Sequence, residues 1–275
     1  MGPLLTSNVH RALRAAARSG VATVACSLDL DRSTASVEIG ATQWRWEGHD
    51  FPYLESCKDR TIYYWSGKAF EPAARFTTSF VKLVPTEWGA PTFEIDGIKM
   101  LRTKHASPYV DAQRKVALIR PRDKVILDTC GGLGYFASCC LASGARLVLS
   151  YEKNADVIWL RALNPWSPQA GPDVGRRLRL TREDITDAIQ QLSDESVDAV
   201  LHDPPRFGVA GELYSAPFYE QLARVLRRKG TLFHYTGSPN TLTSGRDVPQ
   251  EVARRLHHAG FVAKLHGDGV LGRKS

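Results

Sequence analysis

The chain has 275 residues, 43% of them hydrophobic and 24% charged, which is an ordinary composition for a globular protein. This length suffices for a full α/β core and a small second domain. Lysine and arginine outnumber the acids and leave a net charge of +7, which permits a polyanionic partner such as RNA but does not require one.

The sequence argues against membrane, disulfide-stabilised and metal-binding classes. No apolar run approaches the roughly 20 residues that a membrane helix needs, and the first residues lack the charged and apolar regions of a signal peptide. The five cysteines form no CxxC pair, and the eight histidines show no ligand spacing. We therefore expect a cytoplasmic protein with reduced cysteines, no metal site and no membrane contact.

The first 105 residues predict a small β-rich domain. Residues 8–19 have the Ala/Arg pattern of a short helix, and Asp96-Gly97 favours the type I′ turn of a hairpin over residues 93–100. Short strands separated by Gly, Pro and Asp are predicted at residues 21–30, 36–39, 42–46, 61–65 and 76–84. The domain boundary is placed at 105, in a soft region that extends to 122.

Residues 106–275 predict a second domain in which strands alternate with helices, the pattern of a parallel sheet built from βαβ units. The predicted strands are 124–129, 146–151, 176–180, 197–202, 230–235 and 260–265. The predicted helices are 133–143, 154–163, 184–192, 216–229 and 247–259. Gly230 and Gly260 are interpreted as helix C-caps that directly precede strands.

The most informative segment is V-I-L-D-T-C-G-G-L-G at residues 125–134. It predicts a strand that ends at Asp128, a glycine turn, and a helix whose amide donors face a bound ligand. The order of the acid and the glycines differs from the G-x-G-x-x-G fingerprint of dinucleotide-binding sites. No lysine follows the glycines, as a phosphate-binding P-loop would require. An acid at the turn better suits a cationic, nucleotide-like cofactor.

Further acids follow the next two strands. Glu152 follows the second strand, where a carboxylate can accept hydrogen bonds from two vicinal ribose hydroxyls. Asp184 follows the third strand and could accept from an adenine amine, with a plain helix N-cap as an equal alternative.

A second motif, H-D-P-P-R-F at residues 202–207, follows the strand 197–202. With the glycine turn it resembles the ordered motifs of class I S-adenosylmethionine-dependent methyltransferases over about residues 93–265. The resemblance implies a Rossmann-like, mainly parallel sheet with an antiparallel last strand, and S-adenosyl-L-methionine as cofactor. It implies a cofactor site formed by Asp128, Thr129, Gly131, Gly132, Gly134, Glu152, Lys153, Asp184 and Asp203.

Asp203-Pro-Pro is similar to the (D/N/S)-P-P-aromatic motif of methyltransferases that act on exocyclic amines. Such a nitrogen is a poor nucleophile because its lone pair is delocalised into the ring. The Asp203 carboxylate and the Pro204 carbonyl can accept both N–H bonds, which directs the lone pair at the methyl group. The resemblance implies a catalytic set of Asp203, Pro204, Pro205, Arg206 and Phe207.

The longer string from His202 to Ser215, with L-N-P-W at 163–166 and F-H-Y at 233–235, resembles an archaeal group associated with N4-methylation of cytidine in ribosomal RNA. We therefore expect transfer to an amine nitrogen, with the exocyclic amine of an RNA base as the leading hypothesis. Arg206 departs from the family pattern at the stacking position, so Arg206 or Phe207 stacks on a base, or the acceptor is not a flat base.

Three alternatives remain open from the sequence: a methyltransferase of a small amine or protein side chain, an aminopropyltransferase-like enzyme, and a non-catalytic RNA-binding protein. The sequence leaves the oligomeric state open. Basic and aromatic residues just before the second domain fit either RNA contact or a solvated hairpin, and they are Lys99, Arg102, Lys104, His105 and Tyr109.

Overall fold

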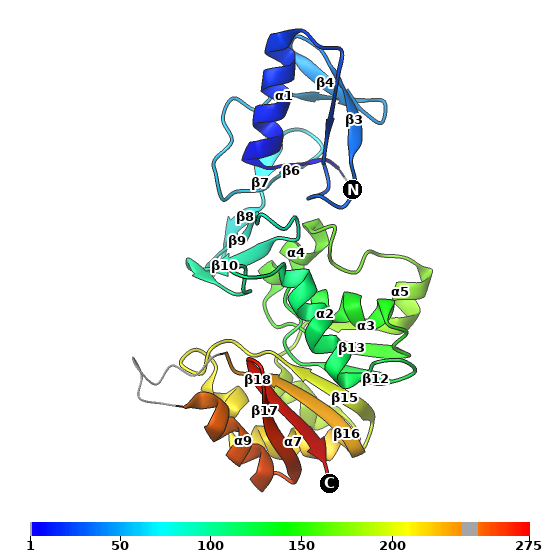
Figure 1. Ribbon diagram of the computed structural model, residues 1–275, viewed down its shortest axis with the longest axis vertical. Coiled ribbons are helices and arrows are strands. Elements are labelled where there is room, and N and C mark those ends of the chain that lie inside the picture. The colour runs from blue at the N-terminus through cyan, green and yellow to red at the C-terminus, as the bar shows by residue number, and fades with distance from the viewer. Residues whose placement is uncertain (1, 238–246) are drawn as a thin grey trace. The chain divides into compact units, whose positions relative to one another are not determined.

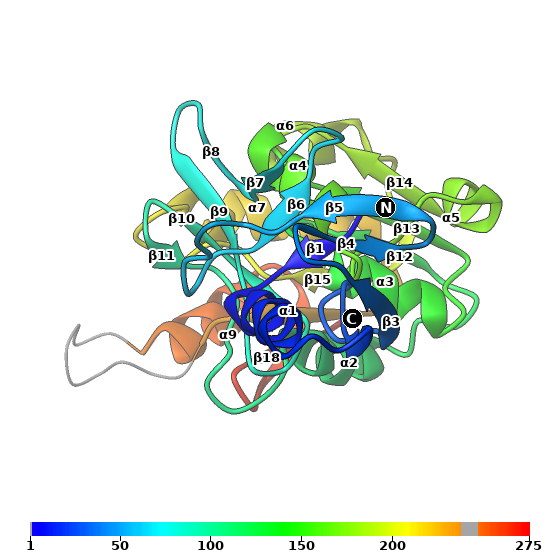
Figure 2. The same ribbon diagram turned by 90° about the horizontal axis from the view of Figure 1, so that it is seen from above.

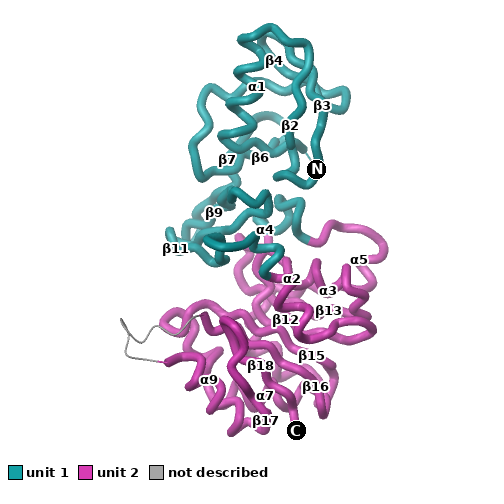
Figure 3. The backbone as a smooth tube through the Cα atoms, in the orientation of Figure 1, with its two compact units in different colours: residues 1–111, 159–167 teal, residues 112–158, 168–275 magenta. Residues whose placement is uncertain are grey.

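The computed structural model describes residues 2–237 and 247–275, and its chain divides into two compact units (Figure 3). Unit 1 contains residues 1–111 and 159–167, and unit 2 contains residues 112–158 and 168–275. The division therefore lies six residues beyond the predicted boundary at 105 (111 against 105). In addition, the segment 159–167 groups with unit 1, which a single cut in the sequence cannot represent.

Over residues 2–107, unit 1 is built from helix α1 and short antiparallel strands (Figures 1 and 2), as the sequence predicted; its segment 159–167 includes the end of α4 (Ala155–Leu163). Its sheets have the strand orders β1-β6-β7, β2-β3-β4-β5 and β11-β10-β9-β8. The elements are β1 (Leu4–Leu5), α1 (Ser7–Ser19), β2 (Thr23–Cys26), β3 (Ala35–Ile39), β4 (Gln43–Trp46), β5 (His49–Pro52), β6 (Tyr63–Trp65), β7 (Phe70–Pro72), β8 (Ala74–Phe76), β9 (Phe80–Val84), β10 (Thr92–Ile95) and β11 (Ile98–Lys99).

Local sequence explains the clearest features of unit 1. Thr6 caps α1 by accepting from the Val9 amide at 3.4 Å, and Gly20 ends the helix at φ 68°. Asp96 and Gly97 have φ of 49° and 79°, as the predicted type I′ turn between β10 and β11 requires.

Unit 2 contains a seven-stranded sheet with the order β14-β13-β12-β15-β16-β18-β17. Among the described strands of this sheet, β18 alone runs opposite to the other six, so the mainly parallel Rossmann-like fold with an antiparallel last strand is confirmed. The strands are β12 (Val125–Asp128), β13 (Leu147–Tyr151), β14 (Leu178–Thr181), β15 (Val197–His202), β16 (Leu226–Tyr235), β17 (Phe261–His266) and β18 (Gly269–Lys274).

Helices connect these strands, and together they bury an apolar core in which Tyr219, Leu222, Val252 and Leu256 lie among strand residues. No helix in the described ranges has both the length and the apolar character to cross a membrane. The helices are α2 (Pro108–Ile119), α3 (Tyr135–Ala142), α4 (Ala155–Leu163), α5 (Pro172–Arg177), α6 (Ile185–Ala188), η1 (Ile189–Gln191), η2 (Gly211–Tyr214), α7 (Ala216–Val225) and α9 (Val248–His258).

The predicted helix 216–229 is too long, and Gly230 is not a helix C-cap. Helix α7 ends at Val225, and β16 begins at once and contains an irregularity before Thr231. A Cβ on Gly230 would lie 2.6 Å from Leu226 Cδ1, so the glycine is required by close packing inside this irregularity. Gly260, in contrast, follows α9 with φ of 90°, as a helix end predicts.

Candidate active site

The ends of four strands bring the predicted motifs to one edge of the sheet in unit 2. Asp128 pairs in register with Ser150 and with Leu201, and His202 pairs with His234. The residues that follow β12, β13, β15 and β16 therefore emerge together. In open parallel sheets this carboxyl edge is where ligands bind.

The glycine turn after β12 has the predicted conformation. Gly132 and Gly134 have φ of 48° and 80°, values that side chains other than glycine rarely adopt. The Gly131 amide donates to the Tyr151 carbonyl at 2.7 Å, which holds the turn against β13. Helix α3 starts directly afterwards, so its first amides point toward the turn.

Glu152 lies beside this turn. Its Oε2 accepts a hydrogen bond from the Gly132 amide at 3.0 Å, and its Oε1 accepts from the Asn154 amide at 2.8 Å. The side chain is half-buried, so the carboxylate is oriented by backbone donors and still borders solvent. This position suits recognition of vicinal hydroxyls.

Asp128 is enclosed at the end of β12. It is 1% exposed, and its Oδ2 accepts from the Ser150 hydroxyl at 2.8 Å on the neighbouring strand. Contact of Asp128 with a bound methyl donor remains a prediction.

Three predicted carboxylates act on the Cys130 thiol through their charge. Burial raises the pKa of Cys130 well above its ordinary value, and the nearby Glu152, Asp128 and Asp203 carboxylates raise it further. The thiol is neutral in this environment, and the surrounding charge is negative. Such a set of donors and acids fits a cationic ligand such as a sulfonium with an α-amine.

Lys153 and Asp184 form an ion pair on the periphery of the site, with Nζ 2.9 Å from Oδ2. Asp184 Oδ1 accepts from the Thr186 amide at 3.0 Å and caps α6. The helix-cap alternative for Asp184 is thus what the structure shows. Recognition of adenine by this carboxylate remains a prediction.

The Asp-Pro-Pro motif follows β15 as a loop over residues 203–207, which we call the acceptor loop. Asp203 is partly exposed, Pro204 is buried, and Pro205 and Arg206 are exposed. The Tyr214 hydroxyl donates to the Pro205 carbonyl at 3.1 Å. No described group donates to the Pro204 carbonyl, so this oxygen can accept from a substrate.

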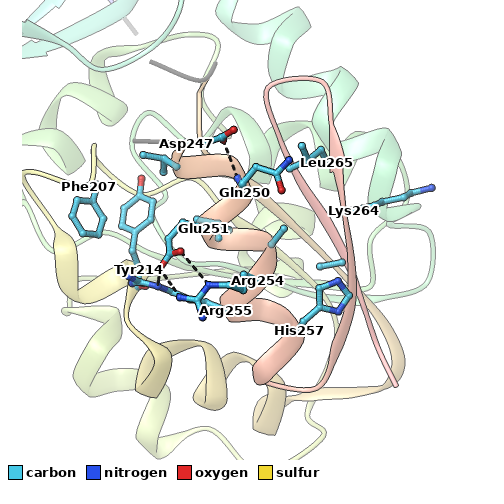
Figure 4. A pocket seen from close by; sticks show the side chains of 14 residues that line it. Phe207, Tyr214, Asp247, Gln250, Glu251, Arg254, Arg255, His257, Lys264 and Leu265 are labelled. Carbon is cyan, nitrogen blue, oxygen red and sulfur yellow. Dashed lines mark hydrogen bonds and ion pairs between the residues drawn. The ribbon is translucent and has the colours of Figure 1, made fainter. Parts of the chain in front are cut away.

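Phe207 packs edge-on against Tyr214, with ring centroids 5.4 Å apart, and both rings line a pocket of about 980 Å³ (Figure 4). Helix α9 and strand β17 form the rest of its wall, where Glu251 accepts from two arginine side chains. Of the two candidate stacking residues, Phe207 borders this pocket and Arg206 does not. The pocket adjoins the acceptor loop and not the glycine turn.

Sequence reasoning missed Lys115, which lies on α2 and is 5% exposed. Its Nζ is 3.8 Å from Asp203 Oδ2 and 3.9 Å from the centroid of the Tyr235 ring. The helix itself was not predicted, although Ser107-Pro108 is a helix-start signal and the Ser107 hydroxyl accepts from the Tyr109 amide. No local motif marks the lysine, because its partner is far away in the sequence.

Two buried histidines lie side by side near the ends of β15 and β16. His202 Nε2 donates to the Leu213 carbonyl at 3.0 Å, so its Nδ1 accepts from the Thr129 hydroxyl at 2.7 Å. His234 Nδ1 bonds the Tyr235 carbonyl, and its ring centroid lies 4.3 Å from that of His202. Both rings are neutral in this arrangement, and we assign them a positioning role.

This pair predicts a specific loss of stability in acid. Burial lowers the pKa of His202 to about 4, against 6.5 for the unfolded chain, and it lowers that of His234 well below the ordinary value. Because the unfolded chain binds the extra protons, the free energy of unfolding should fall as the pH drops from 6.5 to 4, by about 1.4 kcal/mol per unit for each histidine.

Hydrogen exchange of the β15 amides, corrected for intrinsic rates, measures this slope in unit 2. Tryptophan fluorescence would report on unit 1, because all six tryptophans belong to it. His202→Asn should reduce the slope, while replacement of the exposed His49 by Gln should leave it unchanged. An undiminished slope in His202→Asn would show that His202 does not cause the loss of stability in acid.

Comparison with known proteins agrees with this geometry. Residues 169–274 match a family described as S-adenosyl-L-methionine-dependent methyltransferase. The uncharacterized protein MJ1233 of Methanocaldococcus jannaschii is 40% identical over 207 residues, which are 75% of this chain and 69% of that protein.

Solved structures share the fold at low identity. A spermidine synthase in complex with a transition-state analogue is 13% identical, with a TM-score of 0.55 over 74% of this chain and 73% of that one. MnmC2 from Aquifex aeolicus is 18% identical, with a TM-score of 0.52 over 73% and 72% of the two chains. The chain therefore belongs to the S-adenosyl-L-methionine-dependent methyltransferases, and it is an enzyme that uses S-adenosyl-L-methionine.

Proposed function

We propose that this enzyme methylates an amine nitrogen, and that the acceptor is the exocyclic amine of a base in RNA, such as N4 of cytidine in ribosomal RNA. The observation that carries the proposal is the Asp203-Pro204 pair of acceptors at the end of β15. In the register of β12 and β15, Asp128 pairs with Leu201, so Asp203 follows β15 beside the start of the glycine turn. An amine held at Asp203 is therefore held next to the predicted donor site.

The chain's own groups would act by alignment. The Asp203 carboxylate and the Pro204 carbonyl accept the two N–H bonds, and the nitrogen lone pair is thereby turned away from the ring and toward the donor. S-adenosyl-L-methionine supplies a methyl group made electrophilic by its sulfonium. Transfer would join the nitrogen to this methyl group with cleavage of the S–C bond, and the methylated nitrogen would release one proton to solvent.

Lys115 supports this role of Asp203. Its ammonium lies 3.8 Å from Oδ2, and the face of Tyr235 covers it on another side. A neighbouring cation favours the ionised carboxylate, which can only accept hydrogen bonds. We therefore assign Lys115 as a positioning residue that keeps Asp203 an acceptor.

Two further observations favour a base in RNA. The net charge of +7 suits a polyanionic partner. Phe207, at the border of the acceptor-side pocket, offers a ring for stacking, which replaces the aromatic residue that the family pattern places at position 206.

The test offers methyl-labelled S-adenosyl-L-methionine with ribosomal RNA transcripts, with polyamines and with total protein in parallel. Label in RNA, found as a methylated exocyclic amine by mass spectrometry of nucleosides, would support the proposal. Label confined to polyamine or protein would establish one of the sequence alternatives. Transfer of an aminopropyl group from decarboxylated donor would identify the aminopropyltransferase alternative.

Glu152→Gln should weaken binding of S-adenosyl-L-methionine by about 10- to 100-fold, since a charged acceptor of hydroxyl groups is worth about 1.5–3 kcal/mol. Calorimetric titration of the full chain measures the dissociation constant. Glu183→Gln is the matched control, because Glu183 is an exposed acid on the same edge. A dissociation constant within twofold of the parent value for Glu152→Gln would remove Glu152 from the donor site.

A further inference from the structure

Two phenylalanines are exposed on the outermost hairpin of one sheet in unit 1. Phe76 is 70% exposed and Phe80 is 42% exposed. They are directly paired across the β8–β9 hairpin (Figure 2), so both rings lie on the same face of the sheet. Paired aromatic rings left in water on a small domain are an unfavourable arrangement unless they have a partner.

The core does not need these rings. On the opposite face of β9, Val81 and Leu83 are completely buried. The alternation along β9 therefore places its apolar core contacts on one face and Phe80 on the other. The exposed pair is a surplus apolar surface of this sheet.

Cations share the face with the two rings. The register places Lys82 opposite Glu94 and Glu94 opposite Lys99, in one row with the same orientation as Phe80. Glu94 is 4% exposed, and it is paired with Arg60 and with Lys82, whose Nζ is 3.4 Å away. The acid within the row is thus covered by cations.

The accessible charge of the face is positive. The Arg60 side chain is 65% exposed and Lys99 is exposed. An exposed acid, Asp96, lies in the turn between β10 and β11, where its Oδ1 accepts a hydrogen bond from the Phe80 amide at 2.8 Å. Rings that can stack, with cations beside them, are the combination that binds unpaired nucleotides.

We propose that this aromatic-basic face, formed by Arg60, Phe76, Phe80, Lys82 and Lys99, binds a single-stranded segment of the RNA substrate. The inference rests on the proposed RNA acceptor and names the surface that recruits it. Phe76 and Phe80 stack on unpaired bases, and the three cations contact phosphates. Because the face and the catalytic unit share one chain, binding raises the local concentration of RNA for the enzyme.

The test uses the full chain and a fluorescein-labelled 12-residue oligouridine, with anisotropy measured at several salt concentrations. Phe76→Ser/Phe80→Ser should weaken binding by about 5- to 150-fold for each stacked base that is lost, since stacking on one base is worth about 1–3 kcal/mol. Lys82→Gln/Lys99→Gln should reduce the slope of log affinity against log salt by about 1.4. Val21→Ser, which removes another exposed apolar side chain of unit 1, is the matched control and should bind as the parent does.

Binding of S-adenosyl-L-methionine by each variant verifies that the fold is kept. Unchanged RNA affinity in Phe76→Ser/Phe80→Ser would overturn the inference. If that variant instead loses a self-associated form in sedimentation while its RNA affinity is unchanged, the face is a contact between copies of the chain, and the inference is again overturned.

The same measurements separate this inference from the proposed function. A parent protein that binds oligouridine through this face, but methylates no RNA in the transfer assay, would overturn the RNA acceptor and support the binding face. If the parent and Phe76→Ser/Phe80→Ser methylate RNA equally well and bind it with the same affinity, the binding face would be overturned and the RNA acceptor supported.

Discussion

Replacement of Asp203 by alanine is expected to lower the rate of methyl transfer by about 10³-fold while S-adenosyl-L-methionine still binds, because one oriented group that acts on the reacting atom is worth about 10²–10³ in rate. The carboxylate is at the end of β15 and is partly exposed, as a substrate contact must be. Single-turnover transfer to the identified acceptor, with calorimetry of the donor, measures both quantities.

Two controls make this result specific. Asp203→Asn keeps an acceptor oxygen and should retain more activity than Asp203→Ala. Asp194→Ala removes an exposed acid that pairs with Arg224 in the same unit, and it should leave transfer unchanged. Full activity in Asp203→Ala would show that this carboxylate does not hold the amine.

Replacement of Lys115 by methionine is expected to have the second large effect. Lys115 is 5% exposed but the Asp203 side chain is 20% exposed, so loss of the ammonium should cost less stability than the about 3–5 kcal/mol of a fully buried ion pair. Without the ammonium, the Asp203 carboxylate should take up a proton at higher pH, since a nearby cation favours its charged form. As the pH is lowered, turnover in the variant should therefore be lost at a higher pH than turnover in the parent.

The pH profile separates positioning from a merely structural role. Asp203 is faced by Lys115 from α2, by Tyr214 from η2 and by Cys130 from the glycine turn, and Tyr235 covers the lysine. Measured at a temperature where the variant is folded, the acid limb of Lys115→Met should shift, and Lys115→Arg should largely restore it. An acid limb at the parent position in Lys115→Met would limit the lysine to a structural role.

Much of the fold could be predicted because its signals are local. The alternation of strands and helices after residue 122 follows from hydrophobic periodicity, and the hairpin at Asp96-Gly97 follows from two residues that accept positive φ. Errors arose where packing overrode propensity. Residues 226–229 have helical character, yet Leu226 pairs with Val197, and the residues up to Thr231 form an irregularity of β16 in which Gly230 lies close to Leu226.

The candidate site divides in the same way. The glycine turn and the Asp-Pro-Pro motif each consist of neighbouring residues, so Gly132 and Asp203 could be named from the sequence. Glu152 could be named because it directly follows a predicted strand. The role of Asp184 could not be decided, since a carboxylate after a strand fits both a ligand contact and the N-cap that the structure shows.

The sequence by itself determined the parallel α/β class, the glycine turn and the acceptor loop, because each depends on residues within a few positions of one another. The tertiary structure alone decided that Lys115 lies beside Asp203, that β18 lies between β16 and β17, and that residues 159–167 group with unit 1. These features join segments that are distant in the chain, and the free energy that selects them comes from burial and pairing of whole elements, which no local pattern records.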